Sequence, residues 1–265
     1  MRVVSLNANG IRSAARKGFF DWLMLQDVDV LCVQETKAQE HQLADDVFRP
    51  KGYHVYFVDA QKKGYSGVAI YCKQKPKHVV TSLGFDIADN EGRYVQIDYD
   101  HLSIASLYLP SGTSGDVRQA VKYDFLTKFE KPLRQFMQSG REYIVCGDWN
   151  IAHKKEDLKN WRGNQKSSGF LPEERAWMDK LLGEMGFVDA FRVVNQQPDQ
   201  YSWWSHFGHA YENNAGWRID YQMVTPGLKE AVRVASIARA PRFSDHAPVI
   251  LDYDLKVVPK IKGLV

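Results

Sequence analysis

The sequence contains few cysteines and no long apolar segment, and each scarcity excludes a class of protein. Only three cysteines occur among 265 residues, Cys32, Cys72 and Cys146, and each lies within an apolar run. An odd and dispersed set argues against a disulfide framework and fits a reducing cytoplasm. The N-terminal apolar run is too short for a signal-peptide core, and no later run approaches a membrane-spanning helix. We therefore expect a cytoplasmic protein without a membrane partner.

Excess charge of either sign is also scarce. The chain has 35 Lys and Arg against 32 Asp and Glu, a formal net charge of +3, with 25% charged and 44% hydrophobic residues. This balance is typical of a globular protein and excludes a disordered tail. Because the net charge is small, nucleic-acid binding would require a locally basic face.

Short strand-like runs alternate with amphipathic helical patterns. The runs cover residues 2–6, 28–33, 68–72, 95–98, 103–109, 143–146, 217–224 and 247–253. Helical spacing appears at residues 17–26 and 173–185. The pattern predicts an α/β fold in which two sheets pack face to face with helices outside. No linker or repeat divides the chain, so we expect one domain over residues 1–255 and a short basic tail over residues 256–265.

Polar residues gather where these apolar strands end. Any one of them alone is explained by strand capping or a turn, but their number favours a shared site at one sheet edge. The set comprises Asn7, Asn9, Glu35, Tyr108, Asp148, Asn150, Asp220, Asp245 and His246.

This set has the chemistry of metal-assisted phosphodiester hydrolysis. Glu35 is a hard oxygen ligand suited to Mg²⁺ or Mn²⁺. Asp148 can orient or deprotonate a water, with Asn150 on the same face of an extended segment. Asn7, Tyr108 and His246 supply donors for phosphate oxygens.

Adjacent Asp245 and His246 do not form a pair if both are extended, because successive side chains point to opposite faces. The carboxylate that orients His246 is then expected from another strand, and Asp220 is the best candidate. Such a partner raises the imidazole pKa and favours the protonated form. Asp245 is left to face the metal or its waters.

An ordered series of motifs resembles the exonuclease III type of AP (apurinic/apyrimidinic) endonuclease, within the endonuclease/exonuclease/phosphatase superfamily. The motifs are NANGIR, LCVQETK, GYSGVAIY, LYLPSG, CGDWN, SGFLPEER, WRIDY and SDHAPV, and they run from the N-terminus to about residue 255. The resemblance implies a four-layered α/β sandwich. It also implies Mg²⁺-dependent hydrolysis on the 5′ side of an abasic site in double-stranded DNA, leaving a 3′-hydroxyl, and action on blocked 3′ ends.

The resemblance also implies roles for individual residues. Glu35 corresponds to the metal ligand, supported by Asn9 and Asp245, and Asn9 is neutral where some members carry an Asp. Asp148 corresponds to the residue that aligns or activates the water, with Asn150 its companion. The remaining matches are phosphate ligands and the residue that holds the imidazole: Asn7, Tyr108, His246 and Asp220.

Further family positions concern the DNA substrate. Trp203, Trp217 and Ile219 match positions that line the pocket for a flipped-out sugar without its base, and Asn164 matches a position beside the scissile phosphate. Trp204 has an even chance of being a core residue. Basic residues that we expect to follow DNA phosphates are Lys62, Lys63, Lys122, Arg162 and Lys166.

Two local patterns are interpreted as decoys. His206 and His209 form an H-x-x-H, but no Cys or carboxylate stands at zinc-ligand spacing. The Gly/Ser-rich residues 111–115 lack the lysine of a phosphate-binding loop and are expected to form a plain turn.

Two alternatives belong to other classes. A phosphatase or lipid phosphodiesterase of the superfamily should lack the tryptophan pocket and the SGFLPEER segment. A non-catalytic or dual-role nucleic-acid-binding regulator of the catabolite repression control type shares several stretches but should have lost an active-site residue, whereas Glu35, Asp148, Asn150 and Asp245 are intact. Small residues at 167–169 favour endonuclease over 3′→5′ exonuclease activity, and a monomer is expected.

Overall fold

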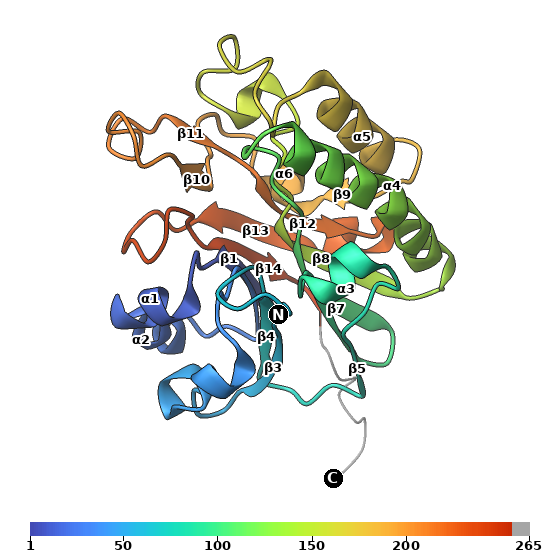
Figure 1. Cartoon of the computed structure of the whole chain (residues 1–265). Helices are drawn as coiled ribbons and strands as arrows, with labels where there is room; N and C mark the ends of the chain where they lie inside the picture. Colours follow the sequence, from blue (N-terminus) through green and yellow to red (C-terminus); the bar gives the residue numbers. More distant parts are fainter. Residues whose placement is uncertain (256–265) are drawn as a thin grey trace.

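Two mixed six-stranded sheets form the centre of the computed structural model, which describes residues 1–255 (Figure 1). Sheet A has the order β13 (Val232–Ile237), β14 (Val249–Tyr253), β1 (Arg2–Asn7), β2 (Val30–Gln34), β4 (Val68–Cys72) and β3 (His54–Val58). Sheet B has the order β5 (His78–Val80), β6 (Tyr94–Asp98), β7 (Leu102–Tyr108), β8 (Glu142–Asp148), β12 (Asp220–Val224) and β9 (Val188–Asp189). Strands β1 and β2 are parallel, as are β7 and β8, whereas the other neighbours within the two sheets are antiparallel.

Alternation of side chains along each strand explains why both faces of the sheets are apolar. In β2, Val30 and Cys32 lie in the core between the sheets, whereas Leu31 and Val33 face the helices outside sheet A. Successive side chains of a strand point to opposite faces, so a strand buried on both sides has a continuous apolar sequence. The two outer faces therefore need helices to cover them.

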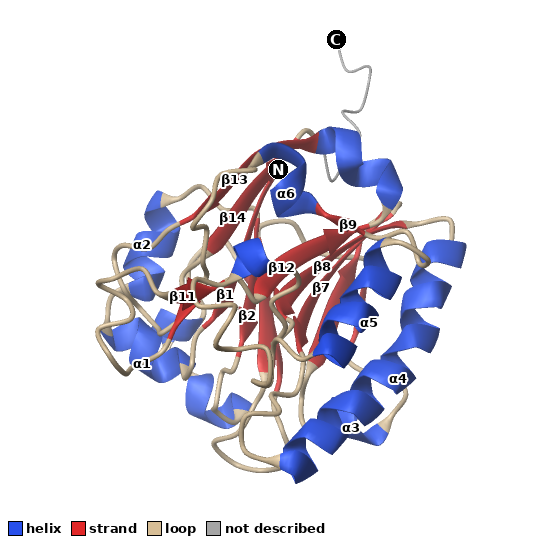
Figure 2. Ribbon diagram, turned by 90° about the horizontal axis from the view of Figure 1, so that it is seen from above, coloured by secondary structure: helices blue, strands red, loops and turns tan. Residues whose placement is uncertain are grey.

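Helices cover both outer faces, which makes four layers (Figure 2). Helices α1 (Ile11–Arg16) and α2 (Phe19–Leu25) pack on sheet A. Helices α3 (Asp86–Asn90), α4 (Asp116–Gln138) and α5 (Pro172–Leu182) pack on sheet B. The remaining short helices are α6 (Ala190–Val194) and the 3₁₀ turns Glu40–Leu43, Asp46–Phe48, Lys155–Asp157 and Pro226–Ala231. The predicted four-layered α/β sandwich is confirmed.

Several predicted boundaries were wrong for identifiable reasons. The predicted strand 217–224 is interrupted at residues 218–219, because Trp217 ends β11 (Gly216–Trp217), which pairs with β10 (Trp203–Trp204). The predicted strand 247–253 begins only at Val249, after Pro248, which has no N–H for a sheet. The prediction did not include α4, β3 or β13. The predicted tail, residues 256–265, lies outside the described residues.

None of the helices within residues 1–255 combines the length and the apolar character needed to cross a membrane.

Candidate active site

The predicted site residues converge on one cleft at the edge of the two sheets. Because β1 and β2 are parallel, as are β7 and β8, the carboxyl ends of each pair lie together. The cleft has a volume of about 890 Å³. Predicted residues that line it are Asn9, Glu35, Tyr108, Asp148, Asn150, Lys166, Trp203, Trp217, Ile219, Asp245 and His246.

Three of these residues adopt the left-handed backbone conformation. Their φ values are +42° at Asn9, +49° at Glu35 and +52° at Asn150. This region is tolerated by asparagine but is uncommon for glutamate. Such strain persists where the surrounding structure imposes it, and it clusters at functional sites. The left-handed conformation of Asn150 also corrects the expectation that Asn150 and Asp148 share a face of an extended segment. Asn150 instead lies beside Asp148 because the chain turns after the strand.

Asn7 is the buried centre of the site. Its side-chain amide donates hydrogen bonds to Glu35 Oε1 at 2.8 Å and to Asp148 Oδ2 at 2.9 Å, and its Oδ1 accepts one from the Asn9 backbone at 2.9 Å. The amide is therefore fully engaged in this structure and links the two carboxylates. A phosphate contact by Asn7 stays a prediction.

A cationic group lies among the predicted metal ligands. Lys37 Nζ is 2.7 Å from Glu35 Oε2 and also donates to Asn9 Oδ1. Burial by itself would raise the pKa of Glu35, but the Lys37 charge and the bonds from Lys37 and Asn7 lower it below its ordinary value. Glu35 is therefore held as a carboxylate. The sequence analysis did not assign Lys37, although it stands within the LCVQETK motif.

Asn9 is linked to Glu35 through Lys37 and contacts the last predicted ligand, Asp245, directly. Its Nδ2 donates to Asp245 Oδ1 at 2.9 Å, a bond that an aspartate at this position could not make. Asp245 also accepts bonds from Trp203 Nε1 at 3.1 Å and Ser244 Oγ at 3.0 Å. Although burial would raise the pKa of Asp245, the His246 charge and these bonds lower it to about 2.

The donor set of Glu35, Asn9 and Asp245 fits a hard divalent cation. All three supply oxygen atoms, and the Lys37 ammonium already in contact with two of them marks a place that attracts positive charge. Asp148, Asp220 and His246 form a second group whose ligand atoms lie within 4.8 Å of one another. That group is better explained as an imidazole between two carboxylates, because His246 is already hydrogen-bonded to Asp220 and lies 3.9 Å from Asp148.

The contacts of His246 confirm the prediction that Asp220 orients its imidazole. His246 Nδ1 lies 2.8 Å from Asp220 Oδ2, and Nε2 lies 3.9 Å from Asp148 Oδ2. Burial alone would lower the pKa of His246, but the Asp220 charge and hydrogen bond raise it to about 10. Adjacent Asp245 makes no part of this pair, as predicted, although both residues precede β14 and do not lie in a regular strand. The imidazole is therefore protonated at neutral pH and its Nε2–H faces the cleft.

Asp148 has the electrostatics of a general base. Burial, followed by the nearby Asp220 charge, raises the pKa of Asp148 to about 7, against the opposing effects of His246 and Asn7. Asn150 donates to it from its backbone N at 2.8 Å and from Nδ2 at 3.3 Å. A carboxylate whose pKa lies near neutrality is matched to accepting a proton from water.

Tyr108 is held by a residue that the sequence analysis missed. The buried Arg93 donates to the Tyr108 carbonyl at 2.9 Å, and its guanidinium lies 4.7 Å from the centre of the Tyr108 ring. Arg93 Nη2 also donates to Tyr65 Oη at 2.9 Å. The ring of Tyr65 in turn lies 5.3 Å from Lys62 Nζ, so this cluster joins the predicted lysine loop to Tyr108.

The apolar end of the cleft contains the predicted pocket residues. The rings of Trp203 and Trp217 pack edge to face with centroids 6.2 Å apart, and Ile219 packs with them. The buried Arg218 lies between two of these residues in sequence and bonds Asp157 at 2.8 Å. Trp204 is buried and does not line the cleft.

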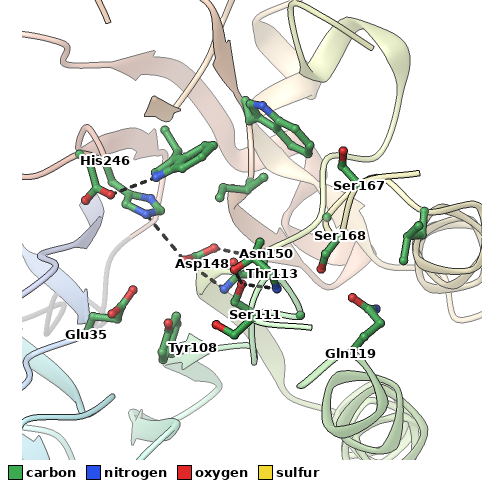
Figure 3. A pocket seen from close by; sticks show the side chains of 18 of the residues that line it. Glu35, Tyr108, Ser111, Thr113, Gln119, Asp148, Asn150, Ser167, Ser168 and His246 are labelled. Atoms are coloured by element: carbon green, nitrogen blue, oxygen red, sulfur yellow. Dashed lines mark hydrogen bonds and ion pairs between the residues drawn. The ribbon is translucent and has the colours of Figure 1, made fainter. Parts of the chain in front are cut away.

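Hydroxyl groups line the side of the cleft that lies away from Glu35 and Tyr108 (Figure 3). Glu35 and Tyr108 lie on one side of Asp148 and Asn150, whereas Ser167, Ser168 and Gln119 lie on the other. Residues 111–115, which we interpreted as a plain turn, also line the cleft. That interpretation was incomplete, because a turn without a lysine can still reach a site through its hydroxyls.

One basic residue was assigned wrongly. Lys122 is fully buried and paired with the equally buried Glu174, so it cannot contact DNA phosphates. Its place on α4, facing sheet B, explains the error, since the chemistry of a lysine does not reveal which face of a helix it occupies. Lys62, Lys63, Arg162 and Lys166 are exposed, and their DNA contacts stay predictions.

Asn164 and His206 lie near residues of the cleft. Asn164 Oδ1 accepts a bond from Ser167 Oγ at 3.0 Å, which places Asn164 behind a residue of the cleft wall. Its contact with the scissile phosphate stays a prediction. His206 Nε2 lies 3.6 Å from Asp245 Oδ2.

Comparisons with known proteins agree with this geometry. The family model described as "Endonuclease/Exonuclease/phosphatase family" matches residues 4–246. The chain is 39% identical over 258 residues to an exodeoxyribonuclease of Bacillus subtilis, covering 95% of this chain and 98% of that protein. It is 35% identical over 259 residues to the DNA repair nuclease APEX1 of Danio rerio, covering 95% and 81%. The structure of an AP endonuclease from Archaeoglobus fulgidus superposes with a TM-score of 0.87 at 26% identity, covering 96% of this chain and all of that one.

The chain therefore belongs to the endonuclease/exonuclease/phosphatase family, and within it to the exonuclease III type. It is an enzyme of the metal-dependent phosphodiesterase class, as the motifs predicted. Its resemblance to the catabolite repression control branch stays a prediction.

Proposed function

We propose that this protein is a Mg²⁺-dependent AP endonuclease of DNA repair that cuts double-stranded DNA on the 5′ side of an abasic site and leaves a 3′-hydroxyl. It also removes blocks from 3′ ends and has weak 3′→5′ exonuclease activity. The observation that supports this proposal most directly is that Glu35, Asp148 and the protonated His246 face one cleft. The apolar end of the same cleft is formed by Trp203, Trp217 and Ile219. The names of the bacterial and archaeal relatives support the same substrate class.

In this proposal the residues divide the work of hydrolysis. Asp148 orients the water and accepts its proton, and Asn150 holds the Asp148 carboxylate in place. The His246 imidazolium and Tyr108 donate to the phosphate oxygens as their charge increases, whereas Asn7 holds the Glu35 and Asp148 carboxylates together. Glu35 would hold the metal, with Asn9 and Asp245 in support, and a bound divalent cation would supply neutralisation of the charge that develops on the phosphate and leaving oxygen. Mn²⁺ is expected to substitute, since it prefers the same oxygen ligands.

The aromatic end of the cleft supplies selectivity. Trp203, Trp217 and Ile219 form an apolar slot that accepts a deoxyribose without a base and excludes a whole nucleotide by size. Extrusion costs least where base pairing is already lost, which favours damaged sites. Lys62, Lys63, Arg162, Lys166 and Asn164 then contact the DNA backbone around the flipped sugar.

We further propose that the protein acts as a monomer in the cytoplasm, where its three buried cysteines stay reduced. A purely regulatory role of the catabolite repression control type is not favoured, because Glu35, Asp148, Asn150 and Asp245 all line one cleft.

One incision assay tests the proposal. A duplex carrying a single tetrahydrofuran abasic analogue is incubated with the protein and Mg²⁺, with chelator, and with Asp148→Asn. We expect one cut 5′ of the analogue, no cut with chelator, and a loss of about 10²-fold to 10⁴-fold in Asp148→Asn.

Asp252→Asn is the matched control, because this carboxylate pairs with Arg2 and takes no part in the cleft. It should cut at the parental rate. Incision in the presence of chelator, or full activity of Asp148→Asn, would contradict the mechanism. Degradation of an intact matched end as fast as incision would contradict the endonuclease preference.

A further inference from the structure

A buried ion pair lies directly behind the active site. Lys122, on α4, and Glu174, on α5, are both fully buried and in contact through Nζ and Oε1. Removing two charges from water is costly, and buried pairs of this kind are often no more stabilising than apolar residues. The contacts that the pair makes with the site therefore require a separate explanation.

Lys122 reaches the site through a backbone carbonyl. Its Nζ donates to the Asn150 carbonyl oxygen at 2.7 Å. Asn150 has the left-handed conformation with φ +52°, and its amide groups hold Asp148. The ammonium thus braces the strained residue that orients the proposed general base.

Glu174 reaches the opposite wall of the cleft. Its Oε2 accepts hydrogen bonds from the backbone N–H of Gly169 at 2.6 Å and of Leu171 at 2.9 Å. Gly169 and Leu171 line the cleft beside Ser167 and Ser168. One carboxylate therefore fixes the segment that forms this wall of the cleft.

The two walls meet at Gly169 with no spare room. A Cβ on Gly169 would lie 3.1 Å from the Asn150 carbonyl oxygen and 3.3 Å from Cζ3 of Trp217, and its φ is +93°. The Ala152 backbone N–H also donates to the Gly169 carbonyl at 2.7 Å. Asn150, Gly169 and the sugar-pocket tryptophan consequently share one close-packed junction, which the ion pair holds from behind.

We propose that Lys122 and Glu174 are positioning residues, which set the placement of Asn150 and of the Gly169–Leu171 wall and thereby the rate of incision. The inference rests on the proposed AP endonuclease function. Neither side chain touches the substrate, so the pair acts through Asn150, Gly169 and Leu171. A misplacement of about 1 Å in a site of this kind costs about 10²-fold in rate.

A double-mutant cycle separates positioning from stability. Lys122→Met, Glu174→Gln and the double variant are compared with the parent for kcat and KM on the abasic duplex, and for the free energy of unfolding. Lys122→Met should lose about 10-fold to 100-fold in kcat with KM almost unchanged. It should also be destabilised, because Glu174 then carries an unpaired buried charge. The double variant should regain stability but not kcat, because no group holds the Asn150 carbonyl.

Leu133→Ala is the matched structural control, since Leu133 is a buried residue of the same helix that packs on sheet B away from the cleft. It should lose stability and keep the parental kcat. Recovery of both stability and kcat in the double variant, or an unchanged kcat in folded Lys122→Met, would overturn the proposal. If Lys122→Met does not fold, the double variant and Glu174→Gln decide by the same criteria.

The two proposals fail in different ways. A parent protein that does not incise the abasic duplex contradicts the proposed function and the inference built on it. A parent that incises, with variants that retain its kcat, contradicts the positioning role alone.

Discussion

Oδ2 of Asp220 lies 2.8 Å from Nδ1 of His246, and this bond determines which imidazole nitrogen faces the cleft. Asp220 opens β12 directly opposite Asp148 at the end of β8. The two carboxylates therefore flank one imidazole, and the cation between them offsets their mutual repulsion. Ser202 Oγ donates to the same Asp220 oxygen at 2.6 Å, which fixes the carboxylate in turn.

Replacing Asp220 should change the pH dependence of incision. In the parent the pKa of His246 is about 10, so the imidazolium persists through neutral pH. In Asp220→Asn the main group that raises this pKa is gone, and the donor form should be lost as the pH rises through about 6.5. We expect kcat/KM of the variant, relative to that of the parent at the same pH, to fall between pH 6 and 8, measured by initial rates of abasic-site incision. A variant profile parallel to that of the parent would contradict the assignment.

Glu35 and Lys37 should affect the metal requirement in opposite directions. Glu35→Gln removes a ligand charge and should raise the Mg²⁺ concentration for half-maximal incision by about 10-fold or more. Lys37→Met removes the ammonium that neutralises Glu35, so the site becomes more negative and this concentration should decrease. Titration of incision rate with Mg²⁺ measures both. A shift of the same sign in the two variants would show that Lys37 does not compete with the cation.

The apolar slot should control discrimination between abasic and intact DNA. Trp217→Ala and Ile219→Ala enlarge the slot, so the ratio of kcat/KM for abasic over undamaged duplex should fall by about 10-fold or more. Trp22→Ala is the control, because Trp22 lies on α2 and packs on the outer face of sheet A, away from the cleft. It should leave the ratio unchanged. An unchanged ratio in both slot variants would show that the slot does not determine the preference for abasic DNA.

Asp157 should stabilise the fold in a pH-dependent way. Although burial would raise the pKa of Asp157, Arg218 and further bonds lower it below its ordinary value. The resulting stability is fully present above the unfolded pKa of about 3.9 and is lost as the pH falls through the lower folded pKa. Asp157→Asn should therefore cost about 1–3 kcal/mol at pH 7, because the buried Arg218 loses this partner and keeps Asp189. Urea unfolding should show the difference from the parent shrinking below pH 4, and a constant difference would contradict the ion-pair explanation.

The strand-end residues show how far a sequence pattern can lead. Asp148, Tyr108 and Asn7 each lie at the end of an apolar run, and the number of such polar strand ends was enough to predict that they meet at one sheet edge. The pairing of His246 with Asp220, 26 residues earlier, followed from the alternation of side chains. Family motifs supplied the remaining roles, because they carry the chemistry of the whole site and not the geometry of single residues.

The errors have a different origin. Lys122 was assigned to the DNA surface, yet it lies behind Asn150, because the packing of α4 on sheet B decides which helix face is buried. Lys37 and Arg93 were missed for the same reason, since a cation next to a site residue is recognised only from distances. The interruption of the predicted strand at Arg218 depends on the pairing of Trp217 with Trp203, and Arg218 itself is paired with Asp157 and Asp189, which lie far away in the chain.

The amino-acid sequence by itself determined the class of fold, the family and the edge of the sheets where the site forms, because period-two alternation and strand-end chemistry are local properties. Only the tertiary structure decided which charges are paired, buried or free to face the cleft. Those properties depend on distances between segments that are remote in sequence, and the electrostatic environment that they create sets the protonation of Asp148 and His246.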